Sequence, residues 1–464
     1  MKLKISIIAL ALTGMWACQP ELNEFTPSKG NADFTTYMSA GNSLTAGYSD
    51  GALYKSGQEN SYAAILAKQL ETVGRTGEFR IPFIESEDGV GTRGGALVTK
   101  MKMGFSTDCK GVQSPSPVLA NPNATQQELA VLIGTPVGAN GPYNNVGVPG
   151  AKVGHLLAPG YGSLNPYYGR FASAPGNAVV NEFATVQPTF FSLWIGNNDV
   201  LGYATSGGIG DVITPVSGDP GFGFAASYEA IVQYFEFTAT AGVVANIPDI
   251  TSVPFFTTVP YNPIVLTDQA QVDALNAGYA AYNGAMQLFG SELRINWTLG
   301  QNPMVIADAS IQVPAGYEAL KMRQITAEEL VLLSIPQDSI KCGGWGTQKP
   351  VPDQFILTSP EKTEVANAVT AYNQVIEQVA IAHDLAFVDV NAYMKQASST
   401  GIKLDGVMFT NTFVTGNLFS TDGVHLTPQG NAAVANFFID AINAKYSASI
   451  PKVAVSQYNA VLLP

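Results

Sequence analysis

Histidine, cysteine and charged side chains are all scarce in this chain of 464 residues. It holds three histidines and three cysteines, with no Cys-x-x-Cys pair and no two neighbouring histidines, so the sequence gives little support for a zinc site. Lysine and arginine number 23 against 36 aspartates and glutamates, a net charge of −13. Because nucleic-acid binding needs clustered cations, this charge balance argues against it.

Apolar residues and loop-forming residues are abundant instead. The chain is 46% hydrophobic and only 13% charged, so it can bury a large core. Its 46 glycines and 28 prolines predict long ordered loops. No internal repeat or low-complexity tract is present. The composition is that of an exported globular protein.

One of the three histidines, His425, follows Asp422 by three residues. At that spacing the carboxylate can accept the ring N–H, which fixes the tautomer of the imidazole and stabilises the cation formed when the ring takes a proton. A pair of this kind indicates a proton-accepting base. It therefore predicts that a nucleophile lies elsewhere in the chain.

Ser43 is the candidate nucleophile. Residues 34–40 are β-branched, aromatic and small, as in a short strand, and Gly41 then allows a sharp turn before the serine. A helical turn starting at Ser43 would aim free N–H groups at negative charge on a substrate. The alternative for a serine in this position is an ordinary turn or helix cap.

Two further segments suggest donors for such charge. Residues 190–195 form an apolar run followed by Gly196-Asn197-Asn198-Asp199, which places the Asn198 amide at the end of a buried strand. In residues 144–151, Gly150 has no Cβ, so its backbone N–H can approach a ligand closely. The N–H groups of Ser43 and Gly150 with the Asn198 amide would form an oxyanion hole.

These segments together resemble the four sequence blocks of the SGNH hydrolases, also called GDSL lipases and esterases. The matching stretches, in family order, are GNSLTAG at 41–47, NVGVPG at 145–150, GNND at 196–199 and DGVH at 422–425. The resemblance covers residues 34 to about 446. It implies Ser43 as nucleophile, His425 as base and Asp422 as its orienting partner, with Gly150 and Asn198 as oxyanion donors.

Two positions depart from the family pattern or leave a choice. The family usually has aspartate before the serine, whereas this chain has Asn42, which keeps the shape and the acceptor oxygen but loses the charge. In the second block Gly147 also lies close to Asn145, although the family spacing favours Gly150. The α/β-hydrolase elbow G-x-S-x-G is disfavoured, because residues 41–45 lack its second glycine.

The resemblance implies an enzyme that hydrolyses carboxylic esters without metal or organic cofactor. Its substrate would be a small-molecule or lipid ester. The apolar segments 250–256 and 161–168 would then line an acyl groove, or else serve ordinary packing. The alternatives are a carbohydrate esterase acting on acylated glycan, and a catalytically silent surface lipoprotein that binds a partner on this scaffold.

The N-terminus predicts export. Lys2 and Lys4 precede an apolar run at 5–16, the length of a signal-peptide core and too short to span a bilayer. Trp16-Ala17-Cys18 resembles the lipidation site of bacterial lipoproteins, although Met15 replaces the usual leucine. Residues 1–18 would be the signal peptide, Cys18 the lipid-anchored residue and 19–33 a tether. This places the protein in the cell envelope, at the outer membrane or cell surface; a secreted or periplasmic protein is the alternative.

Cys109 and Cys342 are the other two cysteines. In an oxidising compartment they would pair, and both lie in polar, glycine-containing stretches where a disulfide adds stability. Two separate free thiols are the alternative.

Strand-like and helix-like segments alternate along the chain. Helices are expected after the first block, from Pro360 with Ser359 as N-cap, and from Pro428 with Thr427 as N-cap. The pattern predicts a three-layer α/β/α sandwich with a mostly parallel, flavodoxin-like sheet. We expect one domain at 34–448, with insertions near 75–143 and 263–353, and a C-terminal tail at 449–464.

Overall fold

The computed structural model describes residues 25–464. The predicted signal peptide, Cys18 and the start of the tether lie outside the described residues. Within 25–464, no helix combines the length and apolar character needed to cross a membrane.

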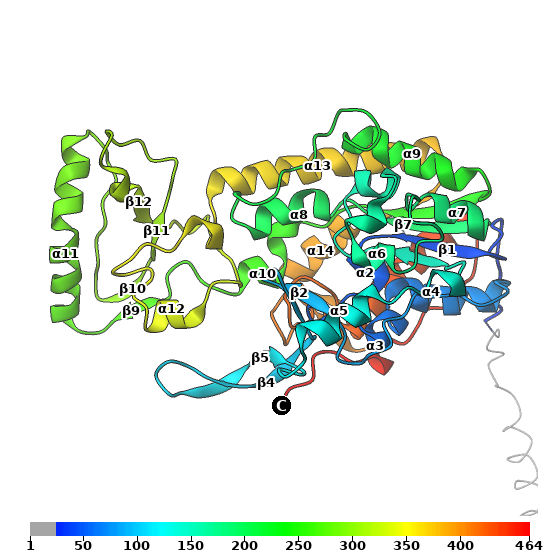
Figure 1. The fold of residues 1–464 in the computed structure, drawn as a ribbon, viewed down its shortest axis with the longest axis horizontal. Coiled ribbons are helices and arrows are strands. Elements are labelled where there is room, and N and C mark those ends of the chain that lie inside the picture. The colour runs from blue at the N-terminus through cyan, green and yellow to red at the C-terminus, as the bar shows by residue number, and fades with distance from the viewer. Residues whose placement is uncertain (1–24) are drawn as a thin grey trace, which may run out of the picture.

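Five parallel strands form the central sheet, in the order β15-β8-β7-β1-β6. The strands are β1 (Tyr37–Gly41), β6 (Asn145–Gly147), β7 (Phe190–Trp194), β8 (Ala241–Ala245) and β15 (Ala386–Val388). Nearly all of their residues are buried, as expected when helices cover both faces of a parallel sheet. The predicted fold class is confirmed (Figure 1).

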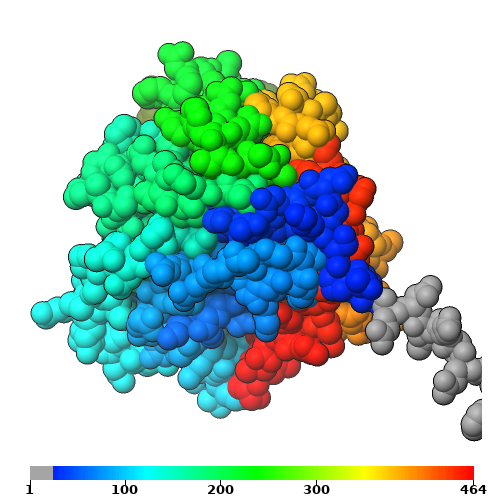
Figure 2. Space-filling model, turned by 90° about the vertical axis from the view of Figure 1, so that its right-hand side faces the viewer, coloured from blue at the N-terminus to red at the C-terminus, as the bar shows by residue number. Residues whose placement is uncertain are grey.

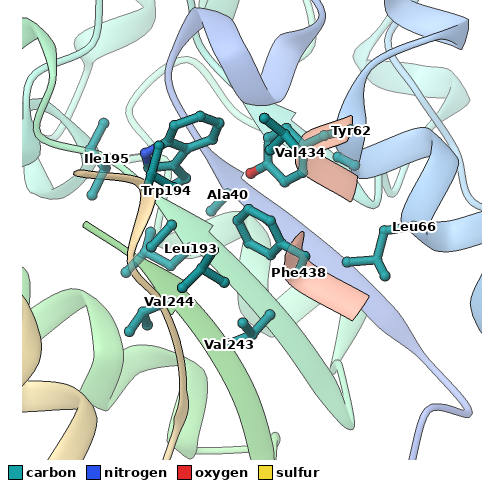
Figure 3. Close-up of a cluster of buried hydrophobic side chains, with 14 of the residues drawn as sticks. Ala40, Tyr62, Leu66, Leu193, Trp194, Ile195, Val243, Val244, Val434 and Phe438 are labelled. Carbon is teal, nitrogen blue, oxygen red and sulfur yellow. The ribbon is translucent and has the colours of Figure 1, made fainter. Parts of the chain in front are cut away.

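Successive residues of β7 show how the two helical layers are built, because side chains alternate between the faces of a strand. Phe190 packs edge-on against Tyr446 of α15 (Pro428–Tyr446), with ring centroids 5.9 Å apart. Phe191 points the other way and stacks on Phe235 of α9 (Phe224–Glu236) at 4.2 Å. On the α15 face, α4 (Tyr62–Leu70) adds Tyr62, which stacks on Phe438 of α15 at 4.7 Å (Figure 3).

Local capping signals place the helices. Thr427 caps α15 as predicted, its hydroxyl accepting the Gly430 N–H at 2.9 Å. Helix α13 (Ser359–Ala382) is capped by Thr358, and the predicted cap, Ser359, is its first residue. The reason is a capping box, in which the Glu361 carboxylate accepts the Thr358 N–H at 2.8 Å. Pro360 still falls in the first turn, where its missing N–H is harmless.

The first insertion consists of two hairpins and a helix. Strand β2 (Gly91–Arg93) pairs with β3 (Ala96–Val98), β4 (Met101–Thr107) pairs with β5 (Gln113–Leu119), and α5 (Gln126–Gly134) follows. The β4–β5 hairpin is a long two-stranded arm that extends away from the sheet (Figure 1).

The second insertion has apolar clusters of its own, one around Trp297 and Met286 and another around Ile306 and Val351. Figure 1 shows it projecting beyond the sheet, with α11 at its outer edge. Its elements are β9 (Ile264–Leu266), α11 (Gln269–Leu288), β10 (Gly300–Asn302), β11 (Val305–Ala307), β12 (Met322–Gln324), β13 (Leu330–Val331), α12 (Gln337–Lys341) and β14 (Ile356–Leu357).

A disulfide joins the two insertions. It links Cys109, in the turn of the β4–β5 arm, to Cys342 at the end of α12, across 233 residues of sequence. Lys341 adds an ion pair with Asp108 at 3.1 Å beside it.

Both ends of the described chain pack on the domain. Ser28 pairs with Ser449 in an antiparallel bridge, and the Asn31 N–H donates to the Tyr446 carbonyl at 2.8 Å. Figure 2 shows the N-terminal segment beside the C-terminal residues on the surface. Residues 28–33 of the expected tether are therefore folded against the domain, and in the expected tail Val455 is fully buried.

Candidate active site

Ser43 lies where the sequence predicts, just beyond the carboxyl end of β1 at the start of the short helix α2 (Ser43–Ala46). A Cβ on Gly41 would lie 2.3 Å from the Trp194 carbonyl oxygen, so only glycine fits this turn. Asn42 caps α2 by accepting the Leu44 N–H at 3.0 Å. The serine itself is 7% exposed, and it faces a pocket.

The structure brings the three predicted triad residues together. His425 Nε2 lies 2.9 Å from Ser43 Oγ, and His425 Nδ1 lies 2.8 Å from Asp422 Oδ2. When Nδ1–H donates to the carboxylate, Nε2 keeps its lone pair and accepts the serine hydroxyl. Residues 382 positions apart in the sequence thus form one hydrogen-bonded chain.

Asp422 is held as a carboxylate. Burial raises its pKa, but the nearby His425 charge and the hydrogen bonds from His425 and Val424 lower it more, so the pKa lies well below its usual range. The Val424 and His425 amides each donate to Oδ1 at 2.8 Å, and the Gly51 amide donates to Oδ2 at 2.8 Å. At neutral pH the imidazole therefore has a negative charge beside it.

The amides of the two glycines of the second block differ in their hydrogen bonding. The Gly147 N–H donates to Asn145 Oδ1 at 2.9 Å, and a Cβ on Gly147 would meet the Ala46 nitrogen at 2.3 Å. Gly150 has a left-handed φ of +78° and open space around it, and its N–H makes no hydrogen bond to residues 25–464. Gly150 is thus the glycine with a donor to offer.

Asn198 begins α8 (Asn198–Thr205) and lines the same pocket as Ser43 and His425. Its Nδ2 donates to the Ala151 carbonyl at 2.9 Å, which uses one of the two N–H groups of the amide. Asp199, the next residue, accepts the Val153 N–H at 3.0 Å. The start of α8 therefore fixes the loop that carries Gly150.

Asn42 makes use of both ends of its amide. While Oδ1 caps α2, Nδ2 donates to Asn197 Oδ1 at 3.5 Å. An ionised aspartate can only accept hydrogen bonds, so it could not make the second contact in this form. The asparagine therefore links the first and third sequence blocks without a charge.

Ser43 and His425 open onto a pocket whose exposed lining is almost wholly apolar. Its walls come from residues after β8, from α14 (Val390–Ser399), from the hairpin of β16 (Ile402–Leu404) and β17 (Val407–Phe409), and from α15. The apolar lining residues are Leu44, Trp194, Leu201, Pro248, Ile250, Val253, Val390, Tyr393, Met394, Ile402, Phe409, Leu418, Phe419, Val424, Leu426, Ala433, Val434 and Phe437.

Of the two segments expected to line an acyl groove, only 250–256 reaches this pocket, through Ile250 and Val253. For 161–168 the packing alternative holds. Tyr168 is fully buried and its hydroxyl donates to Glu182 at 3.0 Å, while Tyr167 packs in a small cluster with Leu53 and Val90.

No family model and no curated protein matches this chain. Among solved structures, an alpha/beta hydrolase enzyme from the Lake Arreo metagenome is 11% identical, with a TM-score of 0.33, over 89% of this chain and 97% of the other. A putative GDSL-like lipase from Parabacteroides merdae is 12% identical, with a TM-score of 0.33, over 90% and 99%. An acetylxylan esterase from Geobacillus stearothermophilus is 10% identical, with a TM-score of 0.33, over 89% and 95%. At these values the roles of residues must be argued from this chain alone.

Sequence reasoning missed one segment of the site, residues 48–51. The Tyr48 ring lies against the His425 ring, with centroids 4.7 Å apart, and the Gly51 amide holds Asp422. No signal in the sequence marks these contacts, because Gly51 and Asp422 are 371 positions apart and follow no periodic pattern.

Among residues 25–464, no group of three or more metal-binding side chains is present.

Asp199, unlike Asp422, has a raised pKa. It is completely buried, Oδ1 has no hydrogen-bond partner, and burial raises its pKa to about 6. A raised carboxyl pKa means that the folded protein binds a proton which the unfolded chain has already lost. Stability therefore falls as the pH rises from about 4 to about 6, and above that the cost reaches about 3 kcal/mol.

We predict that Asp199→Asn removes this pH dependence. Asparagine keeps an oxygen for the Val153 N–H but cannot ionise. Urea unfolding of both proteins between pH 4 and 8 should show the stability of wild type declining relative to the variant by about 2–3 kcal/mol. Parallel pH curves would show that Asp199 stays ionised, or stays neutral, throughout.

Proposed function

We propose that this protein is a serine hydrolase of carboxylic esters, with Ser43 as nucleophile, His425 as general base and Asp422 as the residue that orients His425. The observation that carries the proposal is the continuous hydrogen-bonded chain from Asp422 through His425 to Ser43. A serine hydroxyl is a weak nucleophile at neutral pH, so a base at 2.9 Å is what the chemistry needs.

In the first half-reaction Ser43 Oγ attacks the ester carbonyl carbon while its proton passes to His425 Nε2. The carbonyl oxygen becomes an oxyanion, for which we assign the N–H groups of Ser43 and Gly150 and the Asn198 amide as donors. A donor of this kind contributes roughly 3–4 kcal/mol to the transition state. The intermediate collapses as His425 protonates the leaving alcohol, and the acyl group remains on Ser43.

In the second half-reaction water replaces the alcohol. His425 takes a proton from the water, the hydroxide attacks the acyl carbon, and the same donors hold the second oxyanion. Collapse returns the proton to Ser43 and releases the carboxylic acid. Asp422, kept ionised by its amide donors, stabilises the imidazolium in both halves.

The pocket favours an apolar acyl group. Its walls offer aliphatic and aromatic carbon on all sides, and the polar atoms gather at the Ser43 end. A polysaccharide bound there would leave its hydroxyls without partners, at a cost of roughly 1–3 kcal/mol for each buried group. The pocket volume is about 70 Å³, too small for a long chain, so we infer a short apolar acyl chain, longer than acetyl, in the pocket and the alcohol part outside it. Removal of acetyl groups from glycan is the alternative that the substrate test must separate.

The location of the enzyme is also a proposal. The run of apolar residues at 5–16 followed by Ala17-Cys18 supports a lipid anchor on Cys18 in the bacterial cell envelope. The disulfide between Cys109 and Cys342 agrees with folding outside the cytoplasm. With Ser28 already paired to Ser449, the connecting segment between anchor and domain is residues 19–27.

The first prediction from this function concerns the nucleophile. Ser43→Ala should lower kcat for p-nitrophenyl esters by about 10⁴-fold or more and abolish labelling by a fluorophosphonate probe. Ser163→Ala is the matched control, because that serine lies outside the pocket, and it should keep wild-type activity. Equal hydrolysis by wild type and Ser43→Ala would eliminate the proposed mechanism.

The second prediction concerns the acyl group. The protein without residues 1–18 should prefer acyl chains longer than acetyl, and Leu201→Trp, which narrows the pocket, should lower kcat/KM for the longer esters roughly ten-fold while sparing the acetyl ester. Leu164→Trp, at an 83% exposed position away from the pocket, is the control. A wild-type optimum at acetyl would favour the carbohydrate esterase instead.

The third prediction concerns the anchor. Replacing Cys18 by serine removes the thiol that a lipid would modify, so the full chain expressed in a bacterium should leave the membrane fraction and lose incorporation of labelled palmitate. Retention of the variant in the membrane fraction, in the wild-type proportion, would contradict a lipid anchor at this residue.

A further inference from the structure

The loop that carries the base and its carboxylate, residues 420–426, contains no helix or strand of its own. Its position is set by hydrogen bonds to residues 49–51, which lie a few positions after the nucleophile. The Ser49 hydroxyl donates to the Leu426 carbonyl at 2.9 Å, and the Asp50 N–H donates to Ser420 Oγ at 2.9 Å. The stretch that begins with Ser43 therefore also holds the residues that act on it.

Asp50 lies at the centre of this arrangement. Its Oδ1 accepts both the N–H and the hydroxyl of Thr421, at 3.1 and 2.8 Å, and its Oδ2 accepts the Tyr54 hydroxyl at 2.8 Å. Its backbone is left-handed, with a φ of +54°, a conformation that is unfavourable for most residues with a side chain. The surrounding contacts thus hold Asp50 in a specific and locally costly geometry.

The contacts of Asp50 lead directly to both oxygens of the proposed catalytic carboxylate. Ser420 Oγ, which accepts the Asp50 N–H, donates in turn to Asp422 Oδ1 at 3.2 Å. The following amide, Gly51 N–H, donates to Asp422 Oδ2, the oxygen that faces His425. Any shift of Asp50 would therefore turn the carboxylate and, through it, the imidazole.

Both insertions are linked by backbone hydrogen bonds to the region around Asp50 and the 420–426 loop. The Met101 N–H, at the start of the β4–β5 arm, donates to the Asp50 carbonyl at 2.7 Å. In the second insertion the Leu333 N–H donates to the Phe255 carbonyl at 2.8 Å, and the Phe255 N–H donates to the Gly423 carbonyl at 3.0 Å. The first insertion thus bonds the 49–51 segment directly, and the second reaches the 420–426 loop through Phe255.

We propose that Asp50 is a positioning residue for the ester hydrolysis proposed above: it aims the Asp422–His425 pair at Ser43 by holding Thr421 and Ser420. The inference rests on that proposed function. Asp50 makes no hydrogen bond to His425 and does not line the pocket, so its loss should slow the chemical step and leave ester binding in the apolar pocket unchanged.

The test compares Asp50→Ala, Asp50→Asn and Ser43→Ala in the protein without residues 1–18, on one p-nitrophenyl ester. Alanine leaves the N–H and hydroxyl of Thr421 without their acceptor, whereas asparagine keeps one acceptor oxygen and can still bond the Tyr54 hydroxyl. We expect Asp50→Ala to lower kcat roughly 10–100-fold with KM within two-fold, and Asp50→Asn to restore kcat to within about five-fold of wild type.

Asp33→Ala is the matched control. Asp33 accepts the N–H and the hydroxyl of Thr35 at 2.9 and 2.6 Å, the same chemistry as at Asp50, but on the exposed surface away from the pocket. Its kcat and KM should stay at the wild-type values. An equal fall in kcat in Asp50→Ala and Asp33→Ala would mean a general loss of stability and would overturn the positioning role.

A second variant covers the case in which Asp50→Ala does not fold. Thr421→Val removes only the hydroxyl that Asp50 accepts, and it should lower kcat roughly 3–10-fold at unchanged KM. With Ser43→Ala inactive, a wild-type kcat in folded Asp50→Ala would overturn the inference. If Asp50→Ala does not fold, a wild-type kcat in Thr421→Val would overturn it. Activity in Ser43→Ala would instead overturn the proposed function itself.

Discussion

The hydrogen bond between Ser43 and His425 is the constraint on which the rest of the site depends, because it joins residues 382 positions apart at 2.9 Å. The serine is placed by β1, an inner strand of the parallel sheet. The histidine is placed by α15, which starts three residues later and packs against the sheet and α4. The contact exists only when sheet and helix are correctly docked, so formation of the site reports completion of the fold.

Two buried carboxylates show what the fold must supply to keep a charge inside it. Asp422 receives three backbone N–H groups and an imidazole, and its pKa is lowered despite burial. Asp199 receives one backbone N–H, and its pKa is raised to about 6. The carboxylate with more donors has the lowered pKa, and the one with fewer donors has the raised pKa.

Local sequence signals were sufficient for the fold class and for the location of the proposed triad. The apolar run at 190–195 and the Thr427-Pro428 cap each act through neighbouring residues, so they can be recognised without a structure. The contacts of residues 48–51 with the 420–426 loop could not be recognised from the sequence, because polar pairs so far apart in the chain leave no periodic pattern. The same limit explains why 161–168 resembled pocket lining: burial of a tyrosine does not say which cavity it faces.

The disulfide between Cys109 and Cys342 divides the chain into a closed ring and two flanking arms. Residues 109–342 form a covalent ring that contains Gly150 and Asn198, while Ser43 and the Asp422–His425 pair lie on the two arms outside it. A single peptide-bond cut anywhere within the ring leaves one molecule held together by the sulfur bridge. A cut between Ser43 and Cys109, or between Cys342 and Asp422, instead leaves Ser43 without a covalent connection to the Asp422–His425 pair. The disulfide therefore keeps a nicked chain in one piece over about half of its length, including most of the second insertion, but not in the segments that join this ring to the proposed triad residues.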